Sequence, residues 1–336
     1  MNNFNYITKH FRELYNSNSV PLHSPRFRGK EKEYLSNCID SSYVSSVGKY
    51  VDLFESKIAK LIKTKYAVAV VNGTAGIHTA LRLAGVKAGD EVLTQALTFV
   101  ATSNAILYNN AKPIFLDVDM DTMGLSAEAV SSFLDDYGIM RENFCYNKKT
   151  GRKISACLPM HTFGFPVHLD KLLSVCKKWK IPVVEDAAES LGSEYKGKPT
   201  GSFGKLGVIS LNGNKIVTSG GGGVITCNNS TLSKKAKHLT TTAKSPHEYE
   251  YFHDDLGYNY RMPNINAAIA CAQLDQLDKF LVEKRILANL NADFFKSKGI
   301  KFRTELPETK ANYWLMCIEL ENKKDRDSFL KYTNKN

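Results

Sequence analysis

The sequence predicts an α/β protein with a mostly parallel sheet in a large domain and a smaller α/β domain after it. Short apolar runs alternate with helical patterns between residues 66 and 227, and this alternation is typical of parallel strands joined by crossover helices. The length of 336 residues exceeds one ordinary core. A long helical pattern precedes the last stretch, so we expect an arm and a large domain at 1–250, and a linking helix and a small domain at 251–336.

The expected elements follow in order along the chain. Residues 24–62 suggest an arm followed by a helix, in which Phe54, Ile58 and Leu61 share one face. Further helices are expected at 75–85, 169–179, 265–298 and 326–332. The expected strands are short apolar runs at 66–71, 90–94, 114–118, 155–160, 182–185, 206–211 and 223–227.

The composition disfavours several classes of protein: nucleic-acid binders, disulfide or zinc scaffolds, and membrane proteins. The net charge is +11, but the lysines are spread out and no basic stripe is interleaved with aromatic residues, so we expect no nucleic-acid partner. The seven cysteines include no CxxC pair, which disfavours a disulfide framework and a zinc site. No apolar run reaches the roughly 18 residues of a membrane span, and the first residues lack the apolar core that a signal peptide would have. We therefore expect a cytoplasmic protein without a membrane partner.

A turn of small residues lies between the first strand and its helix. Its sequence is Asn72-Gly73-Thr74-Ala75. The free backbone N–H groups and the partial positive charge of a helix N-terminus bind phosphate, and Gly73 allows close approach of the ligand. The alternative is a plain N-cap formed by Thr74.

The strand at 182–185 leads into a cluster of carboxylates, Glu185, Asp186 and Glu189. Side chains at the carboxyl end of a parallel strand face the ligand crevice of such sheets. Asp186 suits an anion that keeps a pyridinium nitrogen protonated. The alternative is a carboxylate that caps the next helix.

An irregular stretch contains Ser210, Lys215 and the glycine run 220–223. A lysine that is partly enclosed loses some of its preference for the charged form, and its amine can then attack an aldehyde. The alternative is an exposed lysine in a loop. Further on, Asn259 and Arg261 precede the long helix as donors suited to phosphate or carboxylate; the alternative there is a helix entry capped by Asn264.

Taken in order, these segments resemble the DegT/StrS family of sugar aminotransferases that depend on pyridoxal 5′-phosphate (PLP). The similarity runs from about Pro21 to the C-terminus. Its motifs are NGTAGIHTAL, ALTFVATSNAI, MHTFGFPV, VVEDAAESLGSEYKGKPTGSFG, SLNGNKIVTSGGGG and GYNYRMPNINAAIACAQLDQLD. The resemblance implies PLP as cofactor, the aspartate-aminotransferase fold (fold type I), with PLP bound in the large domain, and a homodimer with shared active sites.

The resemblance also implies roles for single residues. Lys215 is similar to the lysine that forms a Schiff base with the cofactor, Asp186 to the partner of the ring nitrogen, and Phe99 to the aromatic residue on the face of the ring, although a plain core phenylalanine is the alternative. Glu189 departs from the glutamine usual beside the phenolic oxygen. A carboxylate there is unfavourable beside a phenolate, so we expect Glu189 to be protonated or turned towards the substrate.

The remaining positions concern the phosphate and the substrate. Gly73, Thr74, Ala75 and Ser210 match phosphate contacts, and Asn259 matches a residue that the neighbouring subunit supplies. His161 and Arg261 match positions near the substrate, and a buried core histidine is the alternative for His161. No pair of histidines has the spacing of metal ligands, so no metal site is expected.

Within the family, the chain resembles the branch that aminates UDP-linked 4-keto-6-deoxy-N-acetylhexosamines for legionaminic-type nonulosonic acids. The segments that carry this resemblance are VSSVGKY, TQALTFVAT, CYNKKTG, HTFG and HLTTTAK. Glutamate is then the expected amino donor. The alternatives are another keto-sugar, such as a substrate of the GDP-perosamine type, and a non-catalytic regulator with the same fold. Related PLP-dependent enzymes that dehydrate sugars at carbon 3 typically have His where this chain has Lys215, which disfavours a dehydratase. The resemblance also leads us to expect some tens of residues beyond Asn336.

Overall fold

A computed structural model describes residues 4–336 of the chain. Its helices are α1 (Asn5–Tyr15), α2 (Glu31–Asp40), α3 (Lys49–Ile62), α4 (Gly73–Ala84), α5 (Val100–Tyr108), α6 (Ala127–Tyr137), η1 (Thr162–Gly164), α7 (Leu169–Lys178), α8 (Ser230–Thr240), α9 (Asn264–Leu274), α10 (Leu277–Ser297) and α11 (Lys323–Lys335). Its strands are β1 (Tyr66–Val70), β2 (Glu91–Gln95), β3 (Lys112–Leu116), β4 (Gly138–Arg141), β5 (Phe144–Asn147), β6 (Ile154–Leu158), β7 (Val184–Asp186), β8 (Glu194–Tyr195), β9 (Lys198–Pro199), β10 (Leu206–Ser210), β11 (Gly223–Cys227), β12 (Lys301–Phe302), β13 (Thr309–Lys310) and β14 (Ile318–Glu319).

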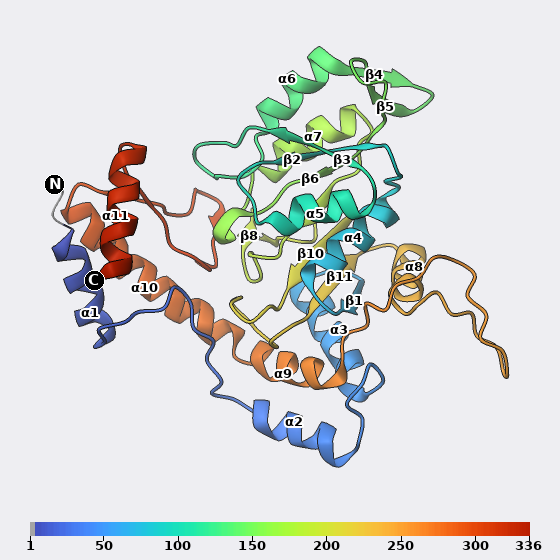
Figure 1. Ribbon diagram of the computed structural model, residues 1–336, viewed down its shortest axis with the longest axis horizontal. Helices are drawn as coiled ribbons and strands as arrows, with labels where there is room; N and C mark the ends of the chain where they lie inside the picture. Colours follow the sequence, from blue (N-terminus) through green and yellow to red (C-terminus); the bar gives the residue numbers. More distant parts are fainter. Residues whose placement is uncertain (1–3) are drawn as a thin grey trace.

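The central sheet has the strand order β1-β11-β10-β7-β6-β2-β3 (Figure 1). Two parallel bridges, Cys157 to Val183 and Met160 to Asp186, join its two halves. The pairs β10–β7, β2–β3 and β2–β6 are parallel, and β11 runs antiparallel to both of its neighbours. The carboxyl ends of β1, β7 and β10 therefore lie at the same edge of the sheet, where ligands bind in folds of this kind.

Helices cover both faces of the sheet. Successive residues of a strand point to opposite faces, so Ala67 and Ala69 pack with α3 and α9, whereas Val68 and Val70 pack with α4 and α8. The buried faces of α6 and α7 pack on β2 and β6 in a third cluster. The result is the predicted layered α/β architecture, and the predicted strands and helices of this part are present within a few residues.

The predicted helix at 265–298 is two helices. The α-helix breaks at Asp275 and Gln276, between α9 and α10. At this point the side-chain amides of Gln273 and Gln276 both donate hydrogen bonds to the carboxylate of Glu31 in α2, at 2.6 and 2.8 Å. The break therefore coincides with a contact that fixes this part of the chain to the first residue of α2.

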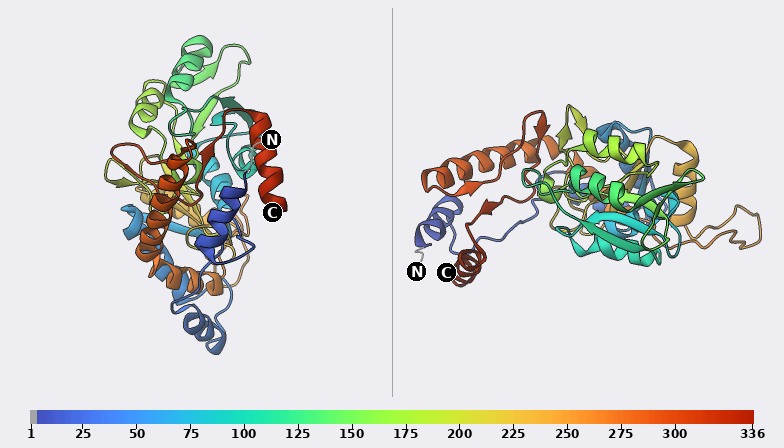
Figure 2. Two further views of the ribbon diagram at one scale, coloured as in Figure 1. Left: turned by 90° about the vertical axis from the view of Figure 1, so that its left-hand side faces the viewer. Right: turned by 90° about the horizontal axis from the view of Figure 1, so that it is seen from above.

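The two ends of the described chain lie together, away from the central sheet (Figures 1 and 2). Phe4 and Ile7 pack against Phe295 of α10, and the aromatic rings of Phe329 and Tyr332 in α11 complete this cluster. The domain boundary at residue 250 stays a prediction, and the N-terminal helix contacts the C-terminal part. Within residues 4–336, no helix is long and apolar enough to cross a membrane.

Candidate active site

Lys215 lies in the turn after β10, with its side chain enclosed. Its ammonium group is 3.5 Å from a carboxylate oxygen of Glu189 and 3.8 Å from the ring centre of Trp314, and 11% of the side chain is exposed. Burial lowers the pKa of Lys215, although the negative charges of Glu189 and Asp186 oppose this. The alternative interpretation of Lys215 as an exposed lysine in a loop is therefore wrong. An amine of this kind is prepared for attack on a carbonyl group.

Asp186 ends β7 and is buried beside α5. The hydroxyl of Thr102 donates to Asp186 Oδ2 at 2.7 Å, and the backbone N–H of Ala188 donates to Oδ1 at 3.2 Å. Burial raises the pKa of Asp186, and the bond from Thr102 opposes that rise. Because the proton of Thr102 is used in this bond, the hydroxyl of Thr98 donates to Thr102, at 2.6 Å. A short chain of two hydroxyls thus supports the carboxylate of Asp186.

Glu189 faces Lys215 and is itself buried. Its second oxygen accepts a hydrogen bond from the backbone N–H of Phe163 at 2.8 Å. Burial raises the pKa of Glu189, and the positive charge of Lys215 opposes this. Burial thus pushes both partners of the pair towards their neutral forms. This agrees with the expectation of a protonated Glu189, which remains a prediction.

The turn before α4 meets the end of β10. A Cβ atom placed on Gly73 would lie 2.9 Å from Cβ of Ser210, so the absence of a side chain is what lets these two segments approach. The helix is capped by Asn72, whose side-chain oxygen accepts from the backbone N–H of Ala75 at 2.8 Å. The cap is therefore Asn72 and not Thr74. Asn72 occupies the N–H of Ala75, so this group is less available for phosphate than the sequence predicts.

Phe99 immediately precedes α5 and is 65% exposed. This exposure excludes the alternative of a core phenylalanine in the monomer. The helix that follows Phe99 contains Thr102 in its first turn, and Thr102 contacts Asp186. The predicted ring partner and the predicted carboxylate are therefore linked through the first turn of one helix.

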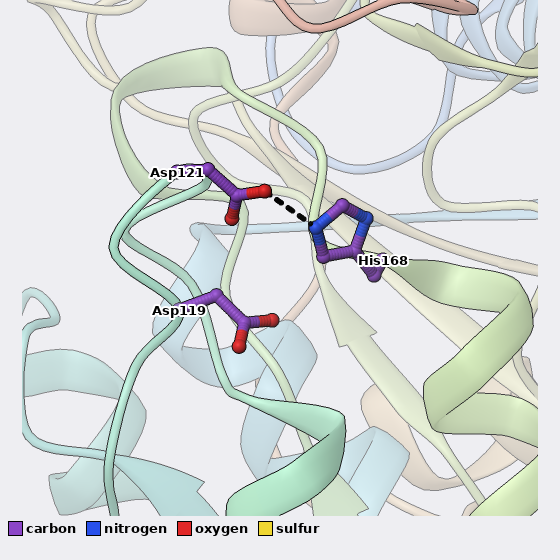
Figure 3. A group of neighbouring side chains, drawn as sticks. All are labelled: Asp119, Asp121 and His168. Atoms are coloured by element: carbon purple, nitrogen blue, oxygen red, sulfur yellow. Dashed lines mark hydrogen bonds and ion pairs between the residues drawn. The ribbon is translucent and has the colours of Figure 1, made fainter.

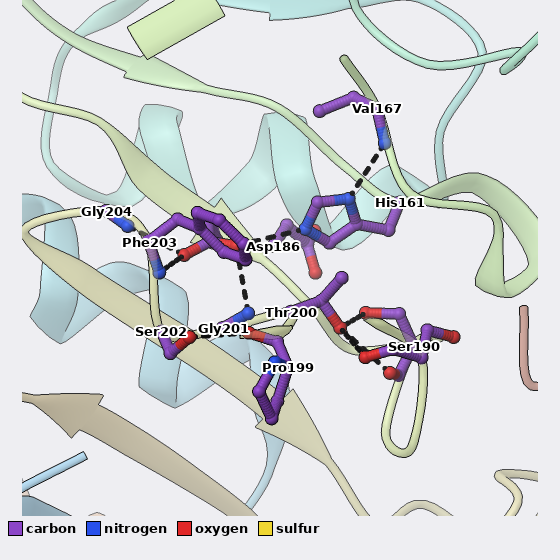
Figure 4. Close-up of polar contacts among 12 residues, drawn as sticks. His161, Val167, Asp186, Ser190, Pro199, Thr200, Gly201, Ser202, Phe203 and Gly204 are labelled. Atoms are coloured by element: carbon purple, nitrogen blue, oxygen red, sulfur yellow. Dashed lines mark hydrogen bonds and ion pairs between the residues drawn. The ribbon is translucent and has the colours of Figure 1, made fainter. Parts of the chain in front are cut away.

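His161 is fully buried behind the site. Its Nδ1 accepts from the backbone N–H of Val167 at 3.3 Å, and its Nε2 lies 3.2 Å from Glu185. Glu185 also accepts three backbone N–H bonds, at 2.6–2.9 Å, from the loop 199–204, and Figure 4 follows this network from Val167 to Gly204. Both ring nitrogens of His161 are thus used internally. The geometry favours the alternative of a buried histidine over a substrate contact.

Asn259 and Arg261 are exposed and lie on one extended segment beside β1. The guanidinium of Arg261 donates to the side-chain oxygen of Asn259 at 3.0 Å. Between them, Tyr260 points inwards and its hydroxyl lies 3.1 Å from His78 of α4. Asn264 is not the cap of α9; its side chain instead accepts from the backbone N–H of Tyr50 at 3.1 Å.

One group in the described chain has the donor types and the proximity that a metal ion requires: Asp119, Asp121 and His168 (Figure 3). His168 begins α7, and its Nε2 lies 2.9 Å from Asp121. This hydrogen bond pairs His168 with Asp121 without an ion between them. The group is formed by two segments outside the Lys215 site, and nothing else at this position indicates an ion.

The structure adds side chains that the sequence analysis did not select. Thr102 lies in the quoted motif ALTFVATSNAI, three residues after Phe99, and a helical reading of that motif could have found it. Three other residues near Lys215 were not selected by any motif, and they approach it only in the folded chain. They are His23, Lys284 and Trp314.

Comparisons with known proteins identify the family of the chain. Residues 25–336 match the DegT/DnrJ/EryC1/StrS aminotransferase family. A Bacillus subtilis (strain 168) protein, EpsN, provisionally named a pyridoxal phosphate-dependent aminotransferase, is 38% identical over 304 residues, which are 90% of this chain and 76% of that protein. The GDP-perosamine synthase of Escherichia coli O157:H7 is 36% identical over 308 residues, covering 92% of this chain and 80% of that protein.

Among solved structures, the Helicobacter pylori aminotransferase PseC, involved in the biosynthesis of pseudoaminic acid, superposes with a TM-score of 0.82. The match covers 92% of this chain and 80% of that one at 22% identity. At this identity the likeness concerns the fold, and it confirms the predicted fold type I architecture. The chain belongs to the DegT/DnrJ/EryC1/StrS aminotransferase family, as its ordered motifs predict.

Proposed function

We propose that this protein transfers an amino group from glutamate to the keto carbon of a nucleotide-linked sugar, with PLP held at Lys215. The observation that carries the proposal is the arrangement around Lys215. A buried amine with a lowered pKa faces Glu189, and Asp186 lies close enough to influence its charge. The family assignment brings PLP as the cofactor of the reaction.

The side chains present suit this cofactor. When bound, PLP supplies an electron sink through its protonated ring nitrogen. Asp186 would pair with that nitrogen, because its carboxylate is buried and held by the Thr102 hydroxyl. The exposed ring of Phe99 would cover one face of the cofactor. These roles are proposals drawn from the geometry and the family resemblance.

The phosphate group would lie at the N-terminus of α4. The backbone N–H groups of Gly73 and Thr74 precede the capped N–H of Ala75, and the hydroxyl of Ser210 is adjacent to Gly73. A helix N-terminus favours an anion through its free N–H groups and its dipole. Asn259 would complete this site from the neighbouring subunit of a homodimer.

Lys215 has two tasks in the proposal. Its Nζ would hold the cofactor covalently, and as a free amine it would act as the base that takes a proton from the α-carbon of glutamate. Both tasks need a neutral amine, and burial favours that form. Glu189 lies 3.5 Å from the same atom and can hold a proton there. The reverse sequence on the keto-sugar completes a two-step, ping-pong cycle.

For the sugar, we propose a UDP-linked 4-keto-6-deoxy-N-acetylhexosamine, on the basis of the motif wording in the sequence. A GDP-linked keto-sugar is the second candidate, since GDP-perosamine synthases of E. coli and Vibrio cholerae are 36% and 33% identical to this chain. Arg261, which matches a substrate position of the family, is an exposed donor available to such a substrate.

The test is a mass-spectrometric assay of the protein with PLP, glutamate and a panel of UDP- and GDP-linked 4-keto-6-deoxy sugars. The proposal expects an amino sugar from at least one UDP substrate, together with 2-oxoglutarate. The visible absorbance of the bound cofactor should be bleached by glutamate and restored by the keto-sugar. A band that responds to neither, with no amino sugar formed, would support the regulatory alternative.

A further inference from the structure

A cavity opens on the side of Lys215 that faces the N-terminal arm. It has a volume of about 250 Å³ and lies between the arm segment 21–28 and helix α10. Three of the side chains that line it are cations, Arg26, Arg28 and Lys284, and the amine of Lys215 also lines it. Glu283 is the one acid among the described lining residues, and it is paired with Arg28 at 3.1 Å.

Lys284 is the most deeply placed of these cations that the proposed chemistry does not use. Its ammonium group donates to the backbone oxygen of Trp314 at 3.0 Å, which leaves two of its three protons for other acceptors. Burial lowers the pKa of Lys284 to about 8, and no nearby carboxylate raises it again. A buried ammonium without an anionic partner is costly, so this position favours an anion that arrives with a ligand.

His23 lies on the opposite wall of the same cavity. Its Nδ1 atom is buried and has no hydrogen-bond partner among the described residues. Burial and the charges of Lys284 and Lys215 lower the pKa of His23 to about 4, so the ring is neutral at pH 7 and can donate one N–H. His23, Lys215 and Lys284 all line this cavity. A buried polar atom without a partner indicates an acceptor missing from the free protein.

We infer that this cavity binds a short dicarboxylate, with one carboxylate held by Lys284 and His23 beside Lys215. The inference rests on the proposed function and adds the recognition of the amino donor and its keto acid to it. The size of the cavity supports this class. About 250 Å³ is below the range typical of drug-sized ligands, which suits a five-carbon diacid better than a nucleotide sugar.

The experiment measures binding of glutarate, which has neither an amino nor a keto group, to the PLP-loaded full chain by calorimetry. Lys284→Gln and His23→Ala are compared with Lys279→Gln, an exposed lysine on the same helix. Loss of one charge-assisted contact should raise the Kd of glutarate at least tenfold in Lys284→Gln, about 1.4 kcal/mol. Lys279→Gln should stay within twofold of the wild type. Butyrate, phosphate and UDP are the competing ligands.

Displacement of glutarate by 2-oxoglutarate, but not by butyrate, phosphate or UDP at equal concentration, supports a dicarboxylate site. Equal displacement by phosphate or UDP overturns it in favour of a general anion or nucleotide site. An unchanged Kd in both Lys284→Gln and His23→Ala also overturns it. If Lys284→Gln fails to fold, His23→Ala on the arm decides alone. The absorbance response of the wild-type protein to glutamate tests the proposed function separately. That response depends on Lys215, and it does not depend on how tightly glutarate binds.

Discussion

Replacing Thr102 by Val removes the strongest support of the Asp186 carboxylate while keeping the shape of the side chain. The Thr102 hydroxyl lies 2.7 Å from Asp186 Oδ2, and both residues are at most 3% exposed. A hydrogen bond to a charged group contributes about 1.5–3 kcal/mol. Because water cannot replace the lost donor in a buried position, we expect the free energy of unfolding of the cofactor-free protein to fall by that amount at pH 7.

The loss should depend on pH in a defined direction. Burial raises the pKa of Asp186 above its ordinary value. Between the ordinary and the raised pKa, the folded protein therefore binds more protons than the unfolded chain. The contribution of this carboxyl to the free energy of unfolding thus falls as pH rises. Without Thr102 the pKa of Asp186 is higher still. The difference in the free energy of unfolding between wild type and Thr102→Val should therefore be small near pH 4. It should reach its full size above the pKa of Asp186 in the variant.

Urea unfolding of wild type and Thr102→Val at a series of pH values measures this effect. Thr98→Val is the matched control, because its hydroxyl contacts Thr102 and not Asp186, and it is partly exposed; we expect a change within about 0.5 kcal/mol. A Thr102→Val difference that is the same at pH 4 and pH 8, or that is no larger than the control, would refute the reasoning.

Three further predictions concern the surroundings of the site. Glu185→Gln should lower the free energy of unfolding by about 2–4 kcal/mol, measured by urea unfolding, because an amide nitrogen cannot accept the backbone N–H bonds that reach this carboxylate; equal stability would contradict the network behind His161. Gly73→Ala should weaken PLP affinity at least tenfold in a fluorescence titration, because its Cβ would lie 2.9 Å from Cβ of Ser210; unchanged affinity would mean that the phosphate binds elsewhere. Glutarate binding should weaken as pH rises through about 8, where Lys284 loses its charge; a flat calorimetric profile from pH 7 to pH 9 would exclude Lys284 as the anion ligand.

The fold could be predicted from the sequence because its signals are local. Apolar runs such as 66–70 and 206–210 are buried strands, and Gly85, with its positive φ, ends α4 as predicted. The direction of β11 was not predictable in this way. The sequence shows an apolar run after the glycines at 220–223, but pairing with β1 and β10 decides that it runs antiparallel.

The sequence predicts the site residues that lie in its motifs, but not the contacts that these residues make. Side chains of neighbouring strand residues point to opposite faces, which separates Glu185, held by the loop 199–204, from Asp186, held by Thr102. The sequence lists both carboxylates side by side and contains no sign of the partner 84 residues away. Trp314 reaches Lys215 across a still larger separation, and contacts of this kind exist only in the folded chain.

The claim that matters most is that PLP is bound through the amine of Lys215. Borohydride reduction of the PLP-loaded protein, followed by protease digestion and mass spectrometry, makes that bond permanent and locates it. We predict that the peptide containing Lys215 carries the mass of the reduced cofactor in stoichiometric yield, and that Lys215→Ala carries none. A cofactor found on another lysine, with the Lys215 peptide unmodified, would contradict the account.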